Sequence, residues 1–301
     1  ITDNTGNQSQ CSANITIIDS ISPLASCIAP GSLTIYLDAS CFASVPASVF
    51  NSGSTDNCNL TSAAYSVGGL LNATFTAANL TTNPNSVTLT VTDPNGNVST
   101  CNTDIIVLDT IRPSLTCVSD TLQLGVSGNA SLSPTMVLGT SIDNCNNSLT
   151  YTLNNGQTSV NYDCLDAGSN TVVLTATDAS GNSNFCTTTV FVEDNLAPNA
   201  SCRPTQTLNL NSGATFGVLS ASMIDLGSSD NCLISTYSLS RDTFNCNDIY
   251  TNPHMVTLTV TDANGNVDSC TSQVTIQDNT APTASCQTAS VYLGTGTVTV
   301  T

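Results

Sequence analysis

The chain has 301 residues and a net charge of −18, with 21 acidic residues against three Arg and no Lys. Nucleic acids and anionic membrane surfaces are bound through Lys and Arg, so this composition excludes both as partners. No apolar run reaches the roughly 18 residues of a membrane span. One His and no Lys also exclude most acid–base and nucleophile pairs, and we expect no enzyme. The acidity suits cation binding; the alternative is that it serves solubility alone.

The chain opens with a motif that recurs along it. Residues 1–11, ITDNTGNQSQC, place an Asp before a Gly-containing turn and a Cys after it. The motif returns as SVTLTVTDPNGNVSTC (86–101), TVVLTATDASGNSNFC (171–186) and VTLTVTDANGNVDSC (256–270). Alternating apolar and polar residues precede each of these three turns, which is typical of half-buried strands. We therefore predict a β-hairpin at each copy.

The spacing of the hairpins defines a repeat. A strand, a linker Asp, a Pro and a further Cys follow each hairpin Cys at fixed spacing, and Pro ends the strand. The repeat is about 85 residues long, a usual size for a seven-stranded sandwich. The predicted domains are 1–21 as the C-terminal end of a repeat, full repeats at 22–111, 112–196 and 197–280, and 281–301 as the start of another.

Each full repeat contains the same inner features. Its first strand is predicted at L-x-I-x-L (33–37) or L-x-L (122–124 and 208–210), and a loop ending in Asp-Asn-Cys follows. No segment sustains a 3.6-residue apolar period, so helix content is expected near zero. We predict an all-β fold of tandem immunoglobulin-like β-sandwich repeats that form an elongated array. The Asp-Asn-Cys loops occupy 56–58, 143–145 and 230–232.

The 14 cysteines predict a disulfide framework and an oxidising, extracellular setting. In a sandwich with an odd number of strands, the Cys that opens a repeat lies near the Cys of the final strand. This count of strand directions predicts Cys27–Cys101, Cys117–Cys186 and Cys202–Cys270. Elimination within each repeat then predicts Cys41–Cys58, Cys145–Cys164 and Cys232–Cys246.

The recurring acids predict a metal site at each junction between repeats. The hairpin turn, the Asp-Asn-Cys loop and the preceding linker Asp should all reach the same end of a sandwich. Calcium takes six to eight oxygen ligands, and three carboxylates without a cation would repel one another. The alternative is that each Asp only caps its own turn. The candidate ligands are Asp19, Asp56, Asn57, Asp93, Asn95, Asp109, Asp143, Asn144, Asp178, Asp194, Asp230, Asn231, Asp262, Asn264 and Asp278.

The T-D-x-x-G-N turn followed by Cys, the linker D-N/T/S-x-x-P and the mid-repeat Asp-Asn resemble the hyalin-type repeat, an immunoglobulin-like module. The sequences VTLTVTDANGN and DNTAPTASC are similar to those in the tandem repeats of very large surface adhesins secreted by gliding and related Bacteroidota. The resemblance covers essentially the whole chain. It implies O-glycans at Asp-Ser/Thr-apolar motifs, with Ser20, Thr110 and Thr121 as candidates.

These features predict the structural shaft of an extracellular adhesin or surface filament, secreted to the cell surface. Its disulfides brace it, and calcium stiffens its junctions. Expected partners are neighbouring repeats, other copies in a filament and surface polysaccharide. One alternative is a set of carbohydrate-binding modules attached to a secreted exoenzyme, which would need exposed aromatic platforms from seven Tyr and seven Phe. Another is an interaction protein whose repeats associate into a bundle.

Overall fold

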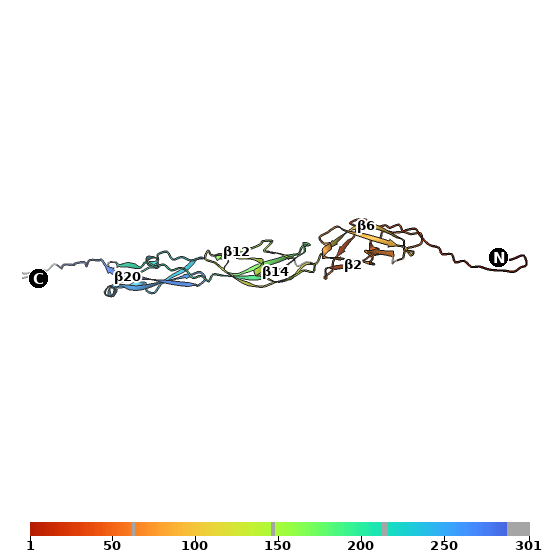
Figure 1. The fold of residues 1–301 in the computed structure, drawn as a ribbon. Coiled ribbons are helices and arrows are strands. Elements are labelled where there is room, and N and C mark those ends of the chain that lie inside the picture. The colour runs from red at the N-terminus through yellow and green to blue at the C-terminus, as the bar shows by residue number, and fades with distance from the viewer. Residues whose placement is uncertain (62–63, 146–147, 212–215, 288–301) are drawn as a thin grey trace, which may run out of the picture. The chain divides into compact units, whose positions relative to one another are not determined.

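The computed structural model describes residues 1–61, 64–145, 148–211 and 216–287 (Figure 1). The segment 281–301 was predicted to start another repeat, and its residues 288–301 lie outside the described residues. The chain divides into two compact units. The first comprises Ile1–Asp120, Leu132–Val160 and Thr171–Val190, and the second comprises Thr121–Ser131, Asn161–Asn170 and Phe191–Thr301.

Strands dominate both units, and the helical segments are short. The strands are β1 (Thr34–Tyr36), β2 (Phe42–Pro46), β3 (Tyr65–Val67), β4 (Asn72–Thr76), β5 (Asn85–Thr92), β6 (Val98–Leu108), β7 (Ser114–Cys117), β8 (Asp120–Gln123), β9 (Asn129–Leu132), β10 (Leu138–Ile142), β11 (Thr150–Leu153), β12 (Val160–Asp163), β13 (Gly168–Thr177), β14 (Ser183–Glu193), β15 (Thr205–Leu210), β16 (Gly217–Val218), β17 (Ile234–Leu239), β18 (Thr243–Phe244), β19 (His254–Asp262) and β20 (Val267–Asp278). The helical segments are α1 (Ala221–Ile224) and the 3-10 helices η1 (Ala47–Phe50), η3 (Ala77–Asn79), η4 (Pro134–Met136), η5 (Cys164–Asp166) and η6 (Cys246–Thr251).

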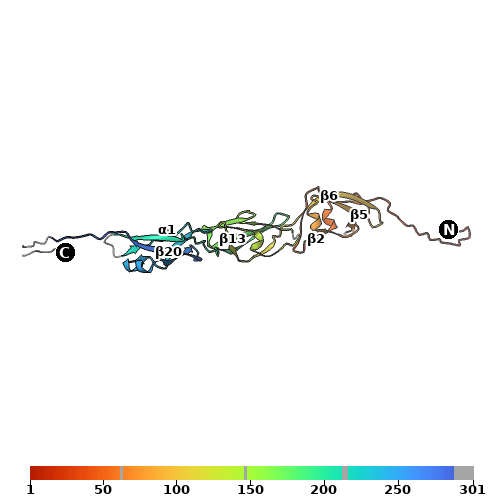
Figure 2. The ribbon, with the colours of Figure 1, turned by 60° about the vertical axis from the view of Figure 1, so that its left-hand side comes forward.

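The first sandwich lies entirely in the first unit, and its strands β2, β5 and β6 are labelled in Figure 2. One sheet has the strand order β1-β6-β5-β3, and β2 pairs with β4 in the other. The hairpin β5–β6 alternates buried and exposed side chains, as its sequence predicts, and it buries Leu89 and Val107 completely. Phe50 and Phe75 from the opposite layer meet edge to face in the core. Burial of this apolar face against the second sheet stabilises the sandwich.

The third sandwich lies entirely in the second unit and repeats this plan. Its main sheet has the order β15-β20-β19-β17, and β16 pairs with β18. Leu258 and Val274 from the hairpin, together with Phe244 and Ile224, are fully buried. The same periodic hairpin sequence therefore builds the same sheet twice.

The second sandwich draws strands from both units. Its sheets have the orders β11-β13-β14-β8, β10-β7 and β12-β9. Three repeated sandwiches confirm the predicted all-β fold of tandem β-sandwich repeats. None of the helices that the structure describes is long and apolar enough to cross a membrane.

The start of each sandwich differs from the predicted single first strand. The segment with the opening cysteine pairs with one sheet, as β7 does with β10, and the chain then changes sheets. The predicted L-x-I-x-L strand, β1, comes second and runs parallel to β6; β15 does the same with β20. Residues 33–37 alternate like any half-buried strand, so their sequence could not show that the preceding segment pairs separately.

Residues 1–21 form the predicted turn without a sandwich around it. Thr2 bridges Gln8, and the carboxylate of Asp3 accepts hydrogen bonds from Thr5 and Asn7. Those bonds, the Asn7 side chain foremost, lower the pKa of Asp3 to about 2. In the strand predicted to follow Cys11, Ile15 and Ile17 alternate with a polar residue as a half-buried strand would, but they are 87% and 93% exposed. No described residue pairs with this segment as a second strand, so its apolar side is not covered.

Candidate metal centres and the bridges beside them

Two groups of three acids form where one sandwich is followed by the next. In the Asp109 site, Asp109 follows β6, Asp143 follows β10 and Asp178 lies in the β13–β14 turn; carboxylate oxygens of the three lie within 4.8 Å of one another. The Asp194 site repeats the arrangement with Asp194, Asp230 and Asp262. Each site therefore combines the linker acid, loop acid and hairpin acid that the sequence predicted to converge.

The hairpin acids cap their turns. Asp178 accepts the backbone N–H of Asn182 on Oδ1 and its side-chain amide on Oδ2, both at 2.8 Å. Asp262 accepts the same two bonds from Asn266. Turn capping, the predicted alternative to metal binding, thus applies to these acids, although each also has an oxygen within its acidic site.

The linker acids of these two sites, Asp109 and Asp194, accept hydrogen bonds from the described residues on one carboxylate oxygen only. Asn144 and the backbone of Ile111 donate to Oδ1 of Asp109, at 3.3 and 3.0 Å. Oδ2 of Asp109 is buried and accepts no hydrogen bond from any residue that the structure describes. Asp194 repeats this: its Oδ1 accepts from Asn231 and Leu196, while its buried Oδ2 has no donor among the described residues. Asp109 is 5% exposed and Asp194 3%.

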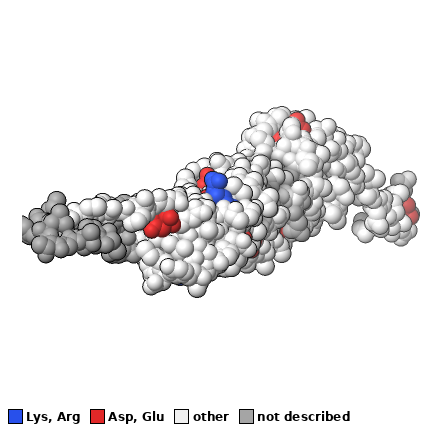
Figure 3. Space-filling view, turned by 90° about the vertical axis from the view of Figure 1, so that its left-hand side faces the viewer, with Lys and Arg blue, Asp and Glu red and all other residues white. Residues whose placement is uncertain are grey.

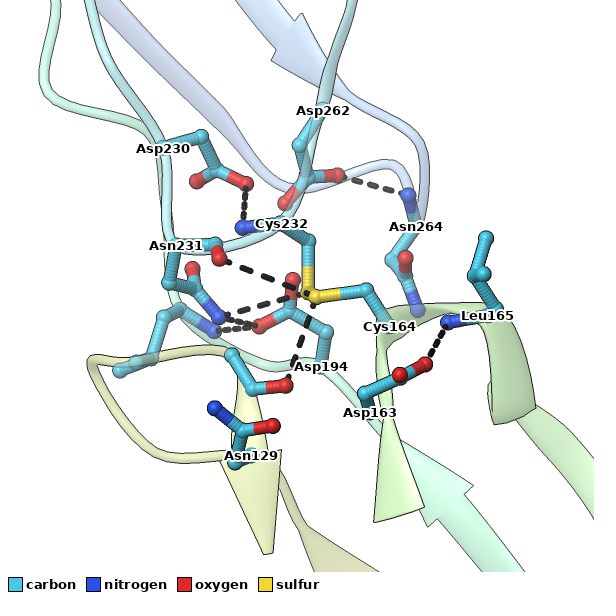
Figure 4. Close-up of a disulfide and its surroundings, with 12 residues drawn as sticks. Asn129, Asp163, Cys164, Leu165, Asp194, Asp230, Asn231, Cys232, Asp262 and Asn264 are labelled. Carbon is cyan, nitrogen blue, oxygen red and sulfur yellow. Dashed lines mark hydrogen bonds between the residues drawn. A yellow bond between two sulfur atoms is a disulfide. The ribbon is translucent and has the colours of Figure 1, made fainter.

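The Asp-Asn-Cys loops supply the third side of each site. Oδ2 of Asp143 accepts the N–H of Cys145, and the side-chain amide of Asn144 donates to the carbonyl of Asp38 as well as to Asp109. The Oδ1 of Asn144 is buried and unbonded among the described residues. The corresponding loop at the Asp194 site has the same turn, in which Oδ2 of Asp230 accepts the N–H of Cys232. Figure 4 shows that loop facing Asp194 and Asp262.

The chain has few cationic side chains that could neutralise the charge of these sites. The chain has no Lys, and Arg241, one of its three Arg residues, pairs with Asp248 at 2.7 Å. Figure 3 shows one face of the molecule on which a few charged side chains lie among many uncharged ones. Buried carboxylates in close contact require a counter-charge or a proton. A cation held by several hard oxygens would meet that requirement.

A cavity of about 280 Å³ opens beside the Asp109 site. All three acids of the site line it, together with apolar walls that include Ala77 and Leu80. The cavity is large enough for several waters. A cation bound by the acids could therefore complete its coordination with water.

Sequence reasoning missed one residue type at these sites. In the three full repeats, the Asn that ends the T-D-x-x-G-N motif donates its side-chain amide to the backbone carbonyl of the linker acid: Asn97 to Asp19, Asn182 to Asp109 and Asn266 to Asp194, at 2.9 to 3.1 Å. These bonds fasten each linker to the hairpin turn of the following sandwich. The recurrence of this Asn in the motif was the available signal.

A third group differs from the other two. It combines Asp19, Asp56 and the free thiol of Cys58, and it does not include the predicted ligand Asp93. Both oxygens of Asp93 accept hydrogen bonds from its own turn, as those of Asp178 and Asp262 do, so turn capping does not explain why Asp93 lies outside this group. A hydrogen bond to Asp19 raises the pKa of the Cys58 thiol, and backbone bonding from Ile21 is the largest cause that lowers the pKa of Asp19.

Four other predicted ligands lie at the margins. Asn57 donates its amide to Asp19, as its counterparts do at the other sites. Asn95 and Asn264 donate backbone N–H groups to the hairpin acid, and the side-chain amide of Asn95 donates to the backbone carbonyl of Asp19. Asp278 is exposed, lies outside the three acidic groups of the described residues and caps its own turn through Thr280.

The structure contains the three long-range bridges Cys27–Cys101, Cys117–Cys186 and Cys202–Cys270. Each joins the opening segment of a sandwich to its last strand. Their Cα–Cα distances of 5.6 to 5.9 Å suit a disulfide.

The other three predicted pairs are wrong in the structure. Cys41–Cys58, Cys145–Cys164 and Cys232–Cys246 are replaced by Cys41–Cys145 and Cys164–Cys232, and Cys58 and Cys246 are free. The elimination allowed partners only within a repeat. The Asp-Asn-Cys loop lies at the end of its sandwich that receives the previous linker, so its cysteine meets a cysteine of the preceding sandwich. Figure 4 shows the second of these bridges beside Asp194.

No protein-family model and no curated protein matches the sequence. Solved structures are similar over most of the chain. The I-band fragment I67–I69 of titin matches 86% of this chain and 100% of its own length, at 9% identity and a TM-score of 0.40. Protocadherin Gamma B2 cadherin domains 1–5 match 86% and 60%, at 14% identity and 0.32. The four N-terminal domains of Dscam1 match 87% and 74%, at 8% identity and 0.31.

Proposed function

We propose that the chain is a non-enzymatic structural segment of an extracellular adhesin or surface filament, with calcium at the joints between its sandwiches. The observation that carries the proposal is the buried Oδ2 of Asp109, repeated by Asp194. Each lies within a group of three acids and lacks a donor among the described residues. Turn capping uses only Oδ1 of these acids, so it does not account for the second oxygen.

The donor set favours calcium over a softer metal. Asp109, Asp143 and Asp178 would supply carboxylate oxygens, and Asn144 would supply its unbonded amide oxygen. Oxygen-only sites of irregular geometry suit calcium, whereas magnesium demands near-ideal octahedra and thiolates favour zinc. Three acids from three elements at one joint would be held together by the ion.

The remaining features support an extracellular structural role. Five disulfides are typical of secreted and surface proteins. The repeat motifs resemble those of large gliding-type adhesins, whose partners would be other copies of the chain or surface polysaccharide. The glycan candidates Ser20, Thr110 and Thr121 are all exposed, as modification by a transferase requires.

Calorimetric titration of the full chain with calcium tests the proposal. We expect the chelator-treated protein to bind at least two calcium ions per chain, and the double variant Asp109→Asn/Asp194→Asn to bind at both sites at least ~10-fold more weakly. A magnesium titration provides the ion control. Absence of binding at millimolar calcium would show that the acids cap turns only, and the joint proposal would fail.

A further inference from the structure

The five disulfides belong to two classes that alternate along the chain. Three close a sandwich on itself and enclose 74, 69 and 68 residues. Two cross from one sandwich to the next, Cys41–Cys145 and Cys164–Cys232. No cysteine is shared, so the two classes define separate covalent routes from the first sandwich to the third.

The linker route runs through the closing bridges. A force that enters at Cys27 passes directly to Cys101, follows the backbone linker to Cys117, and passes by the next bridge to Cys186. The backbone then leads to Cys202 and its bridge to Cys270. Every sandwich interior is bypassed, because its two ends are joined by a bond.

The loop route crosses the joints through the other bridges. It runs from Cys41 to Cys145, along the backbone to Cys164, and across to Cys232. The linker route thus crosses sandwiches by disulfide and joints by backbone, while the loop route does the reverse. The two routes approach each other at the metal sites, where linker Asp109 faces loop Asp143.

We propose that these two routes make the chain a tension-bearing element in which no sandwich can be extended by unfolding. A residue spans at most about 3.3–3.6 Å when extended, so each closing bridge prevents roughly 230 to 260 Å of chain from being pulled out. In an oxidised chain this length is unavailable to a pulling force even if the strands separate. The tension-bearing role rests on the proposed function as a structural shaft, but the two covalent routes follow from the cysteine pairing alone.

The loop route also limits the length of chain that is released when a closing bridge is lost. Without Cys117–Cys186, the shortest covalent path from Cys101 to Cys202 passes through Cys41–Cys145 and Cys164–Cys232. This path is longer than the intact one by roughly 30 residues, or about 100 Å at full extension. Loss of the same bridge from a chain with the linker route alone would release 69 residues, roughly 230 Å.

Single-molecule pulling on the full chain, held at its two ends, distinguishes these cases. Chelator is present and free thiols are alkylated beforehand, so calcium does not contribute and the outcome is independent of the calorimetric test. We expect no step of sandwich size in the oxidised protein. Cys117→Ser/Cys186→Ser should give a step of at most about 100 Å. Adding Cys41→Ser/Cys145→Ser and Cys164→Ser/Cys232→Ser should lengthen it to roughly 230 Å.

Two results would overturn the proposal: steps of about 230 Å in the oxidised parent, or equal steps in the two variants. Circular dichroism of each variant establishes that it folds. If a variant does not fold, graded reduction of the unmodified protein provides the test. Steps of 230 to 260 Å should then appear only after reductant is added, and their presence beforehand would refute the covalent routes.

Discussion

Asp109 and Asp194 use their two carboxylate oxygens in different ways. One oxygen of each accepts two hydrogen bonds that hold the linker, and the other is buried in the acidic site without a donor from the described residues. A carboxylate that served only as a cap would gain nothing from burying its second oxygen, because desolvation of a charge is costly. The asymmetry within one side chain is therefore the clearest mark of a ligand at these sites.

Replacement of Asp194 by Asn isolates that oxygen. Asn keeps an acceptor for the bonds from Asn231 and Leu196 but places an amide nitrogen where Oδ2 was. We expect calcium affinity at the Asp194 site to fall at least ~10-fold, since one of three carboxylates is lost, while the Asp109 site keeps its affinity. Calorimetric titration measures both. Asp278→Asn, at the same register position but outside the acidic groups of the described residues, is the matched control.

Asn266 permits a separate test of the polypeptide part of the joint. Its side chain donates to the linker carbonyl of Asp194 and to Asp262. Asn266→Ala should destabilise the third sandwich by about 1–2 kcal/mol, as expected for lost bonds to a carbonyl and a carboxylate. Urea unfolding in chelator measures the change. Asn264→Ala is the control, because Asn264 bonds Asp262 through its backbone; equal losses would contradict the assignment.

At the scale of elements, the two crossing bridges are built from different positions. Cys164 begins η5, and Ala77 begins η3 in the first sandwich. Cys41 lies in the turn before β2 with φ of 54°, and Gly128 lies in the turn before β9 with φ of 69°. A Cβ at Gly128 would approach Cys164 Sγ to 2.8 Å. Each joint therefore has room for one cysteine near the incoming loop, at one position or the other.

This reciprocity predicts that the positions can be exchanged. In Cys41→Gly/Ala77→Cys, the new cysteine should pair with Cys145, because Ala77 and Cys145 line the same cavity and pack against the same core. Non-reducing peptide mapping would recover the new bridge. Cys41→Gly alone leaves Cys145 without a partner and serves as the control. A double variant in which Cys145 stays reduced would show that η3 cannot take over the role of η5.

The sequence allowed the fold to be predicted because its signals are local. Period-2 alternation, the Asp-x-x-Gly-Asn turn and Pro after the strand specify each hairpin and its end, and β5 and β6 follow them closely. The convergence of Asp109, Asp143 and Asp178 was also predictable, since it follows from which loops share one end of a sandwich.

The crossing bridges could not be predicted by the same means. Pairing between Cys41 and Cys145 depends on how one sandwich meets the next, and no local pattern records that contact. In the absence of such a pattern we expected every cysteine to pair within its own repeat, and this expectation was wrong. One irregularity indicated a different rule: the first repeat has Cys41, and it has Ala77 at the start of η3, where Cys164 and Cys246 begin η5 and η6 in the other two repeats.

For the whole molecule, each joint has three connections of different chemistry. The backbone linker carries Asp109, the bridge Cys41–Cys145 closes a covalent loop across the joint, and the acidic site would add an ion between linker and loop. Removal of the ion leaves both covalent connections in place. Calcium should therefore control local opening of the linker and not the attachment of one sandwich to the next.

Limited proteolysis separates these contributions. The linker between β6 and β7 should open more often without calcium, and calcium at ten times its dissociation constant should slow cleavage near Ile111 about 10-fold. A protease that does not require calcium, such as elastase, is used with and without chelator.

After cleavage, the two fragments should migrate together on a non-reducing gel, because Cys41–Cys145 still joins them, and should separate once reduced. In Asp109→Asn, cleavage near Ile111 should become insensitive to calcium, while the linker after β14 stays protected by the Asp194 site. Fragments that separate without reductant would refute the crossing bridge, and a rate that is the same with and without calcium would refute the ion.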